Sequence, residues 1–339
     1  MCFPVKYIKD VVIPESNKHL ERDMTMSEFF TFIGCLLFMA CHPGAGDREL
    51  WWSTNPVSPR EGAPFRLNDY MSRNRFREIM NAIRYTNKSR PQYHDKFHPV
   101  RQMQDEWNQF MQDEYFSAWW NCLDESMNMC LNPHCPGWMV VPRKPTPFGN
   151  EYHSICDGVM SNNEKERGNP IMWHVELQEG KDRPIELGQK EFNDAGGKTV
   201  GLMMRMHKSI ARQGKACTMD SGFCVSVGIV RLFERLGVYA QSLIKKRGRF
   251  WPKSVPGDQI DEHFHDKPIG YRETLKVEVV GQDMYIHCMK EEKYVTKFMS
   301  TFGTLDEVKD KKARRTPAEG PVIEFYYPEP MSWHNSAKH

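Results

Sequence analysis

Two aspartates stand where one kind of predicted secondary structure gives way to another. Asp124 lies at the junction between a helix-like run and a strand-like run, and Asp220 follows a short apolar strand that leads into a helix. Carboxylates at strand ends, brought together by a sheet, supply the hard oxygen ligands that bind a divalent cation. The alternative is that Asp124 caps a turn and Asp220 caps the helix after it. The pattern indicates either a metal site on two acids or two local caps.

The size and charge of the chain define its broad class. Its 339 residues are enough for two or three domains, and 40% hydrophobic with 27% charged residues is typical of a globular protein. The net charge of +2 and the pI of about 8.0 do not by themselves mark a nucleic-acid-binding protein. Any contact with DNA must therefore come from local basic patches.

The cysteines and the apolar runs indicate in which cellular compartment the protein is expected. The ten cysteines include no C-x-x-C pair, which favours reduced thiols in a cytosolic or nuclear protein. Cys130, His134 and Cys135 could serve as zinc ligands, but they lack a second ligand pair. Residues 1–10 contain no signal-peptide core, and the longest apolar run, Phe29–Cys41, is too short to span a bilayer. We expect no membrane contact.

The first third of the sequence has helical periodicity. Thr25 and Glu28 form a capping-box pattern that starts an apolar helix. Apolar residues at three- and four-residue spacing predict further helices over 68–85 and 100–120. Residues 1–23 are mixed in character and are expected to form an extended lead-in. We therefore predict a mainly helical domain over residues 1–117.

After Asp124 the pattern changes to alternating strands and helices. The predicted helices are Lys198–Arg212 and Val225–Leu236, and the predicted strands are Met127–Leu131, Trp138–Val141, Glu151–Met160, Ile171–Leu177, Ala216–Met219 and Val238–Ile244. This order is typical of an α/β fold with a mixed sheet flanked by helices. We place this core at residues 118–245.

A basic run with interleaved aromatic residues follows the core. Its cations are Lys245, Lys246, Arg247, Arg249 and Lys253. Cations can follow phosphates and aromatic rings can stack on bases, so the run predicts DNA binding, although a solvated loop is the alternative. Residues 246–320 are expected to form a β-rich insertion, and 321–339 a truncated return to the core. A second basic cluster within the insertion comprises Lys311, Lys312, Arg314 and Arg315.

Short motifs spread over most of the chain carry a resemblance to a known family. They are Ser27–Phe30, Leu50–Pro56, Met71–Phe76, Arg84–Asn87, Val100–Gln102, Leu123–Ser126, Arg143–Pro145, Met219–Phe223, Lys246–Arg249, Phe298–Thr301 and Glu324–Tyr327. In their order and spacing, the sequence from about Met24 to Tyr327 resembles the transposase domain of the piggyBac family. No single motif is specific for this family, but the whole series of motifs in this order is.

The resemblance implies a fold, an activity and a set of partners. It implies a ribonuclease H-like core with a β-rich insertion, and cut-and-paste DNA transposition by three aspartates that hold two Mg²⁺ (or Mn²⁺) ions. Asp124 matches the first of these aspartates and Asp220 the second, with Glu125 as a supporting neighbour. The partners implied are transposon ends and target DNA, in the nucleus, and a homodimer is compatible with the resemblance.

The third aspartate of the family has no counterpart here. One alignment puts Asn335 at its position, and the other puts the aspartate beyond His339. The sequence favours the second, since the Gly-Gly-Val of the family motif is missing and the helix expected there is unfinished. The family's Cys-rich zinc region is also missing. We therefore expect little or no cleavage by this chain.

Two other functions remain open at this stage. One is a domesticated, non-catalytic DNA-binding protein on the same scaffold. The other is an unrelated Mg²⁺-dependent nuclease or phosphatase. The basic and aromatic run favours DNA over a small substrate, and the presence of both Asp124 and Asp220 favours catalytic ancestry over a pure scaffold.

Overall fold

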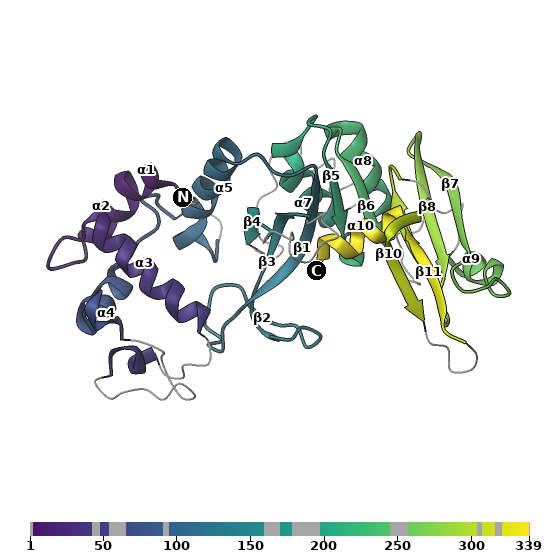
Figure 1. The fold of residues 1–339 in the computed structure, drawn as a ribbon. Coiled ribbons are helices and arrows are strands. Elements are labelled where there is room, and N and C mark those ends of the chain that lie inside the picture. Colours follow the sequence, from purple (N-terminus) through teal and green to yellow (C-terminus); the bar gives the residue numbers. More distant parts are fainter. Residues whose placement is uncertain are drawn as a thin grey trace. The chain divides into compact units, whose positions relative to one another are not determined.

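The chain divides into two units, which we describe separately (Figure 1). The N-terminal unit is Met1–Phe110 and the C-terminal unit is Met111–His339. The computed structural model describes residues 3–42, 48–53, 66–90, 95–158, 170–177, 197–244, 257–303, 307–315 and 321–338. Within these ranges every helix is too short or too polar to cross a lipid bilayer.

The described part of the N-terminal unit is helical. Its elements are α1 (Val5–Tyr7), the π-helical η1 (Ile8–Val12), α2 (Ile13–Asn17), α3 (Met26–Cys41), the 3₁₀ helices η3 (Arg48–Trp52) and η4 (Leu67–Asp69), α4 (Arg73–Ala82) and α5 (His98–Glu114), which continues across the unit boundary. The expectation of an extended lead-in over 1–23 is wrong. Ile8 and Val12, four residues apart, are fully buried in the core of this unit, and that burial stabilises helix there.

Capping residues decide where the longer helices start. The Thr25 hydroxyl accepts a hydrogen bond from the Glu28 amide at 3.2 Å, which confirms the first half of the predicted capping box. Ser72 accepts in the same way from the Arg75 amide at 3.3 Å. Because Ser72 ends the preceding non-helical segment, α4 begins at Arg73 and not at residue 68. Phe29, Phe32 and Phe76 then pack from α3 and α4 into one buried cluster.

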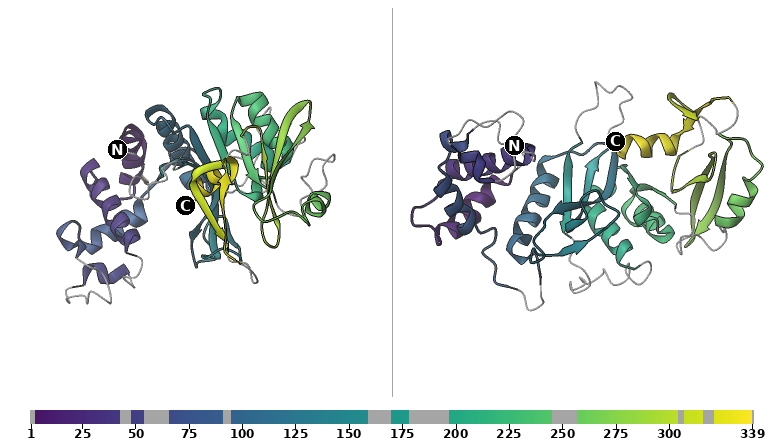
Figure 2. Two further views of the ribbon diagram at one scale, coloured as in Figure 1. Left: turned by 45° about the vertical axis from the view of Figure 1, so that its right-hand side comes forward. Right: turned by 90° about the horizontal axis from the view of Figure 1, so that it is seen from below.

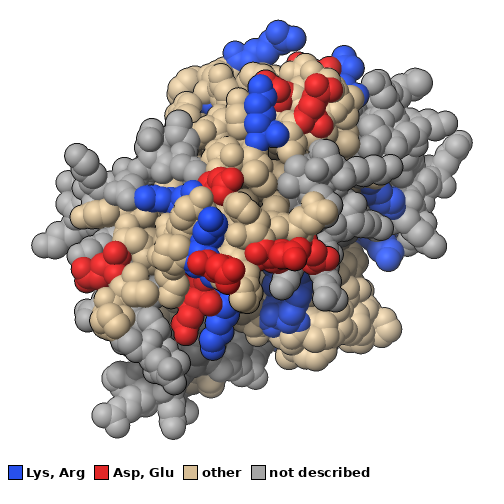
Figure 3. All heavy atoms as spheres, turned by 90° about the vertical axis from the view of Figure 1, so that its right-hand side faces the viewer, with Lys and Arg blue, Asp and Glu red and all other residues tan. Residues whose placement is uncertain are grey.

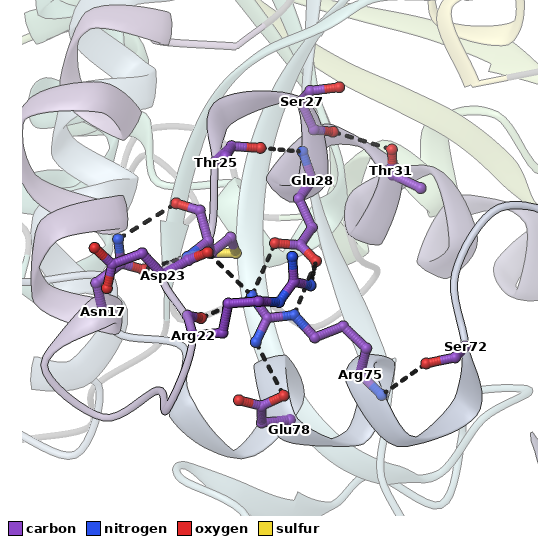
Figure 4. A network of polar contacts seen from close by, with 11 residues as sticks. Asn17, Arg22, Asp23, Thr25, Ser27, Glu28, Thr31, Ser72, Arg75 and Glu78 are labelled. Carbon is purple, nitrogen blue, oxygen red and sulfur yellow. Dashed lines mark hydrogen bonds and ion pairs between the residues drawn. The ribbon is translucent and has the colours of Figure 1, made fainter.

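Arg75 joins α4 to α3 through a buried ion pair (Figure 4). Its Nε and Nη2 donate to the two oxygens of Glu28 at 2.8 Å each, and its Nη1 lies 2.9 Å from Glu78. The Arg75 and Glu28 side chains are only 9% and 16% exposed. Hydrogen bonds from Arg75, and secondarily the charges of Arg75 and Arg22, hold the pKa of Glu28 below its ordinary value despite its partial burial.

The C-terminal unit is built on a nine-stranded sheet whose path order is β2-β3-β1-β5-β6-β9-β8-β7, with β4 pairing β3 (Figures 1 and 2). The strands are β1 (Trp120–Met129), β2 (Trp138–Val140), β3 (Phe148–Asp157), β4 (Met172–Leu177), β5 (Ala216–Met219), β6 (Tyr239–Leu243), β7 (Arg272–Val279), β8 (Gln282–Lys290) and β9 (Val295–Ser300). Strands β1, β5 and β6 are parallel, and the other pairs are antiparallel. The predicted mixed sheet flanked by helices is confirmed.

Helices cover both faces of this sheet. They are α7 (Lys198–His207), with the 3₁₀ helix η6 (Lys208–Ile210) after it, α8 (Ser226–Leu236), α9 (Gly257–His263) and α10 (Glu329–Lys338). Helices α7 and α8 pack on each other and lie on one side of the sheet, while α10 lies on the other (Figures 1 and 2). Gly228 of α8 allows close packing on α7, since a Cβ there would lie 2.9 Å from the Met203 side chain.

The structure differs from the sequence-based expectation in three regions of the C-terminal unit. β1 already begins at Trp120, so Asp124 lies inside a strand and not at its start. The buried pairing of residues 120–123 with β5 outweighs the helical periodicity before them. Strands β7, β8 and β9 extend the core sheet through the pairing of Gln241 with Ser300. The second basic cluster falls in β10 (Glu307–Arg315), which pairs with β11 (Ile323–Pro328) in a separate two-stranded sheet.

Buried polar contacts hold α10 on the sheet. The Thr218 hydroxyl of β5 lies 2.9 Å from Nδ1 of His334, and Nε2 of Gln241 on β6 donates to the Pro330 carbonyl at 2.8 Å. Gln241 Nε2 also lies 3.3 Å from the Thr218 hydroxyl. Trp333 stacks on Phe302 with a ring-centroid distance of 5.4 Å. The helix is therefore fixed to β5 and β6 by a hydrogen-bonded polar network beside an aromatic cluster.

We expect acid to weaken the α3–α4 contact. The folded-state pKa of Glu28 lies below its ordinary value of 4.5, so its stabilisation is complete above that value and is lost as the pH falls through the folded pKa. Hydrogen-exchange protection of α3 and α4 amides should therefore decrease below about pH 4.5. Glu28→Gln should remove that part of the pH dependence and lower protection at pH 7. Glu15→Gln, which removes an exposed ion pair with Lys18, should retain the pH dependence; equal slopes in both variants would contradict this assignment.

Thr218→Val should loosen α10. It leaves the buried nitrogen of His334 without its partner, at a cost of about 1–3 kcal/mol. That corresponds to roughly a five- to hundred-fold loss of hydrogen-exchange protection in α10. Thr274→Val is the matched control, because it removes a threonine hydroxyl that lies 3.0 Å from Nδ1 of another histidine, His287. The expectation fails if both variants lower α10 protection equally.

Candidate metal-binding site

Strand pairing places the two predicted aspartates side by side. Leu123 of β1 and Met219 of β5 are partners in the parallel register; Asp124 follows Leu123 within β1, and Asp220 is the residue just after β5. Side chains alternate along a strand, so both aspartates lie on the face to which Thr218 also belongs. That face is the one covered by α10. The register concerns the backbone alone, and the catalytic and metal-binding roles of Asp124 and Asp220 stay a prediction.

Backbone amides orient both carboxylates. Oδ1 of Asp124 accepts a hydrogen bond from the Glu125 amide at 2.9 Å. Oδ1 of Asp220 accepts from the Ser221 amide, which caps the 3₁₀ helix η7 (Ser221–Phe223). The Ser242 hydroxyl of β6 donates to the Asp220 carbonyl at 2.8 Å. The capping role considered for Asp220 is therefore present, and it fixes the direction of a carboxylate at the strand end.

The Glu125 side chain belongs to the other face of β1. Alternation along the strand separates it from the Asp124 side chain, so the hydrogen bond between these two residues comes from the Glu125 backbone N–H. The Glu125 carboxylate lies 2.6 Å from Arg143 and 3.7 Å from Lys144. Glu125 can therefore orient Asp124 through its backbone N–H, while its carboxylate interacts with Arg143 and Lys144 on the other face.

Helix α10 is helical through Lys338, and the expectation of an unfinished helix in this part of the sequence stays a prediction. Met331, Ser332 and His334 are buried, and Met331 packs with Phe298. The sequence gives little sign of this, because a buried serine and histidine look like surface residues. Asn335 follows His334 and lies one helical turn beyond Met331, on the helix that covers the Asp124 and Asp220 face.

The predicted basic residues are placed only in part. Lys245, Lys246, Arg247, Arg249 and Lys253 lie outside the described residues. The second basic cluster, Lys311 to Arg315, belongs to β10, where the backbone alone is described.

A second group of ligand-type side chains was not foreseen from the sequence. Glu125, Glu151 and His153 each bring a ligand atom within 4.8 Å of the others. The available signal was the alternate spacing of Glu151 and His153 on one predicted strand, together with a partner acid on another. Burial and the Glu125 charge raise the pKa of Glu151, and burial lowers the pKa of His153. Across the described ranges, Cys130, His134 and Cys135 form no such group.

Comparisons with known proteins identify the family. The sequence model of a family described as "Transposase IS4" matches residues 3–339. A cryo-EM structure of the piggyBac transposase synaptic complex with hairpin DNA is similar, with a TM-score of 0.66 and 16% sequence identity. The match covers 99% of this chain and 65% of that one, and it shows the fold. No curated protein sequence matches. Because the family match extends over nearly its whole length, this chain belongs to the IS4 transposase family.

Proposed function

We propose that the chain is the DNA-cleaving core of a piggyBac-like cut-and-paste transposase, with Asp124 and Asp220 as ligands of a divalent cation. The observation that supports this most directly is the parallel pairing of Leu123 with Met219. It sets two carboxylates at the same level of adjacent strands and on the same face. The piggyBac-like fold and the transposase family supply the reaction class.

The donor set at this face suits Mg²⁺ or Mn²⁺. Both prefer carboxylate oxygen and water over nitrogen or sulfur. A cation held there would supply Lewis-acid stabilisation at a phosphodiester. The protein's own part is to hold the oxygen ligands in position, and the Glu125 and Ser221 amides do this by fixing one oxygen of each carboxylate. No protein side chain has to act as a nucleophile in such a reaction.

The proposed metal site lacks an established third carboxylate ligand. Asn335, which one of the two alignments puts at the third aspartate, belongs to α10, the helix that packs over the Asp124 and Asp220 face. An amide oxygen can bind a cation but offsets none of its charge. We therefore propose that cation binding at this face is weak and that cleavage by this chain is slow.

The same residue favours a second function. With an amide at the third position, the chain would serve as a DNA-binding protein on the transposase scaffold without cutting DNA. The two functions predict different effects of an acid at residue 335: cleavage should rise for the first function and stay absent for the second.

Contact with DNA is assigned to the basic run from Lys245 to Lys253. Figure 3 shows one face on which the described Lys and Arg side chains are interspersed with Asp and Glu. Lys276 and Asp283, for example, form an exposed ion pair of 2.7 Å. A mixed face of this kind is poorly suited to follow a phosphate backbone, which favours the concentrated basic segment as the DNA contact. We propose transposon ends and target DNA as partners, a dimer as the working form, and the nucleus as the site of action.

Asn335→Asp should increase cleavage. An added carboxylate offsets metal charge, and we expect Mg²⁺- or Mn²⁺-dependent nicking of a duplex with the element's own end sequence to rise at least tenfold. Asp124→Asn or Asp220→Asn in that background should abolish the gain, because the amide keeps the shape but loses the charge. Asp266→Asn, at a 95% exposed acid, is the control. No gain on Asn335→Asp with DNA binding intact favours the second function, and fast nicking that survives Asp124→Asn refutes the site.

Removing the basic run should weaken DNA binding across sequences. Alanine at Lys245, Lys246, Arg247, Arg249 and Lys253 together should reduce the slope of log affinity against log salt by about 0.9 for each phosphate that the protein no longer neutralises. Alanine at Lys276 and Lys290, two lysines with partners in the β-rich part, is the charge control. A slope unchanged by the first set would support the solvated-loop alternative.

A further inference from the structure

We propose that Glu125, Glu151 and His153 form a second metal site, which binds a divalent transition-metal ion such as Zn²⁺ on the sheet face opposite Asp124 and Asp220. Glu125 of β1 pairs directly with His153 of β3, and Glu151 lies two residues before His153. Alternation places all three side chains on one face. Their ligand atoms lie within 4.8 Å of one another, while the ligands of a tetrahedral Zn²⁺ lie about 3.4 Å apart at bonds of about 2.1 Å. Small side-chain rotations would close the difference.

His153 is the observation that points to a ligand. Its exposed fraction is only 6%. Its Nδ1 is buried without a hydrogen-bond partner in the described part of the chain, and its Nε2 faces Oε1 of Glu151 at 3.7 Å, beyond hydrogen-bond distance. Nε2 is therefore the nitrogen placed to bind a metal ion, and a cation held between it and the Glu151 carboxylate would give this nitrogen a partner. The ring of Phe223 packs edge-on against the His153 ring at 5.6 Å and shields it from water.

The charges around the group leave room for a cation. The Glu125 and Glu151 side chains are 16% and 13% exposed, so two carboxylates share a partly buried space. Arg143 and Lys144 both approach Oε1 of Glu125, at 2.6 and 3.7 Å. Glu125 therefore has its second oxygen for a metal ion, and the side chain of Arg143, 62% exposed, can turn away at little cost.

The donor types select the class of ion. One imidazole nitrogen with two carboxylate oxygens is a set that Zn²⁺ and its neighbours bind, with solvent as a fourth ligand. Mg²⁺ prefers oxygen ligands alone, so it is expected at Asp124 and Asp220 and not here. The two sites therefore differ in donor type as well as in sheet face.

Titration with Zn²⁺ followed by calorimetry tests the proposal, with Asp124→Asn/Asp220→Asn introduced to remove the other acids. This double variant should still bind one Zn²⁺, and excess Mg²⁺ should not displace it. Glu151→Gln and His153→Gln in that background should each weaken the affinity at least tenfold. The matched control is His263→Gln/Glu273→Gln, which removes a histidine–glutamate contact of 2.8 Å outside the group. It should leave the affinity unchanged.

Co²⁺ provides an independent readout through its visible absorption. Adding Co²⁺ to the Asp124→Asn/Asp220→Asn protein should give bands of a nitrogen-ligated ion, which His153→Gln removes. Should His153→Gln fail to fold by circular dichroism, the isosteric Glu151→Gln carries the test alone. Loss of all Zn²⁺ binding in Asp124→Asn/Asp220→Asn, or full affinity in Glu151→Gln, overturns the proposal. The proposed cleavage function is tested separately from this metal site, because its readout is DNA nicking that depends on Asp124.

Discussion

The parallel pairing of β1 with β5 is the constraint on which the candidate site depends. Two parallel strands in register present successive residues at the same level, so Leu123 opposite Met219 puts Asp124 beside Asp220. No short-range feature could do this, because the two strands are separated by β2, β3, β4 and α7. Burial of Trp120, Leu123, Ala216 and Met219 stabilises this pairing, because both strands are covered on both faces of the sheet.

The covering helix depends in turn on buried polar groups that contact one another inside the unit. Thr218, Gln241 and His334 come from β5, β6 and α10, and each would be costly to bury alone. Linked together, they set the position of α10 over the face that carries the two aspartates. Apolar packing of Met331 with Phe298 adds to the attachment, but it has no direction of its own. The hydrogen bonds therefore determine which turn of α10 lies near the strand ends.

Two consecutive acids of β1, Asp124 and Glu125, point to opposite faces of the sheet. Asp124 belongs to the face under α10, whereas Glu125 meets His153 of β3 on the reverse side. The two are coupled through the backbone, because the amide of Glu125 holds a carboxylate oxygen of Asp124. Phe223 makes a second link, since it ends the short helix that Asp220 caps and its ring lies against His153. An ion on the reverse face would thus stiffen the segments that carry both aspartates.

The sequence by itself determined many of the elements and the mixed sheet, because hydrophobic period and caps are local properties, and its resemblance to a family singled out the two aspartates. Ala216–Met219 was placed as a strand at its observed bounds, and Thr25 as a cap. Tertiary structure alone decided that the lead-in is helical, that β1 begins before Asp124, and that α10 packs over the site. These outcomes rest on long-range burial, which can outweigh local propensity. The group of Glu125, Glu151 and His153 exists only through the register of β1 with β3, because strand pairing, not spacing along the chain, brings its members together.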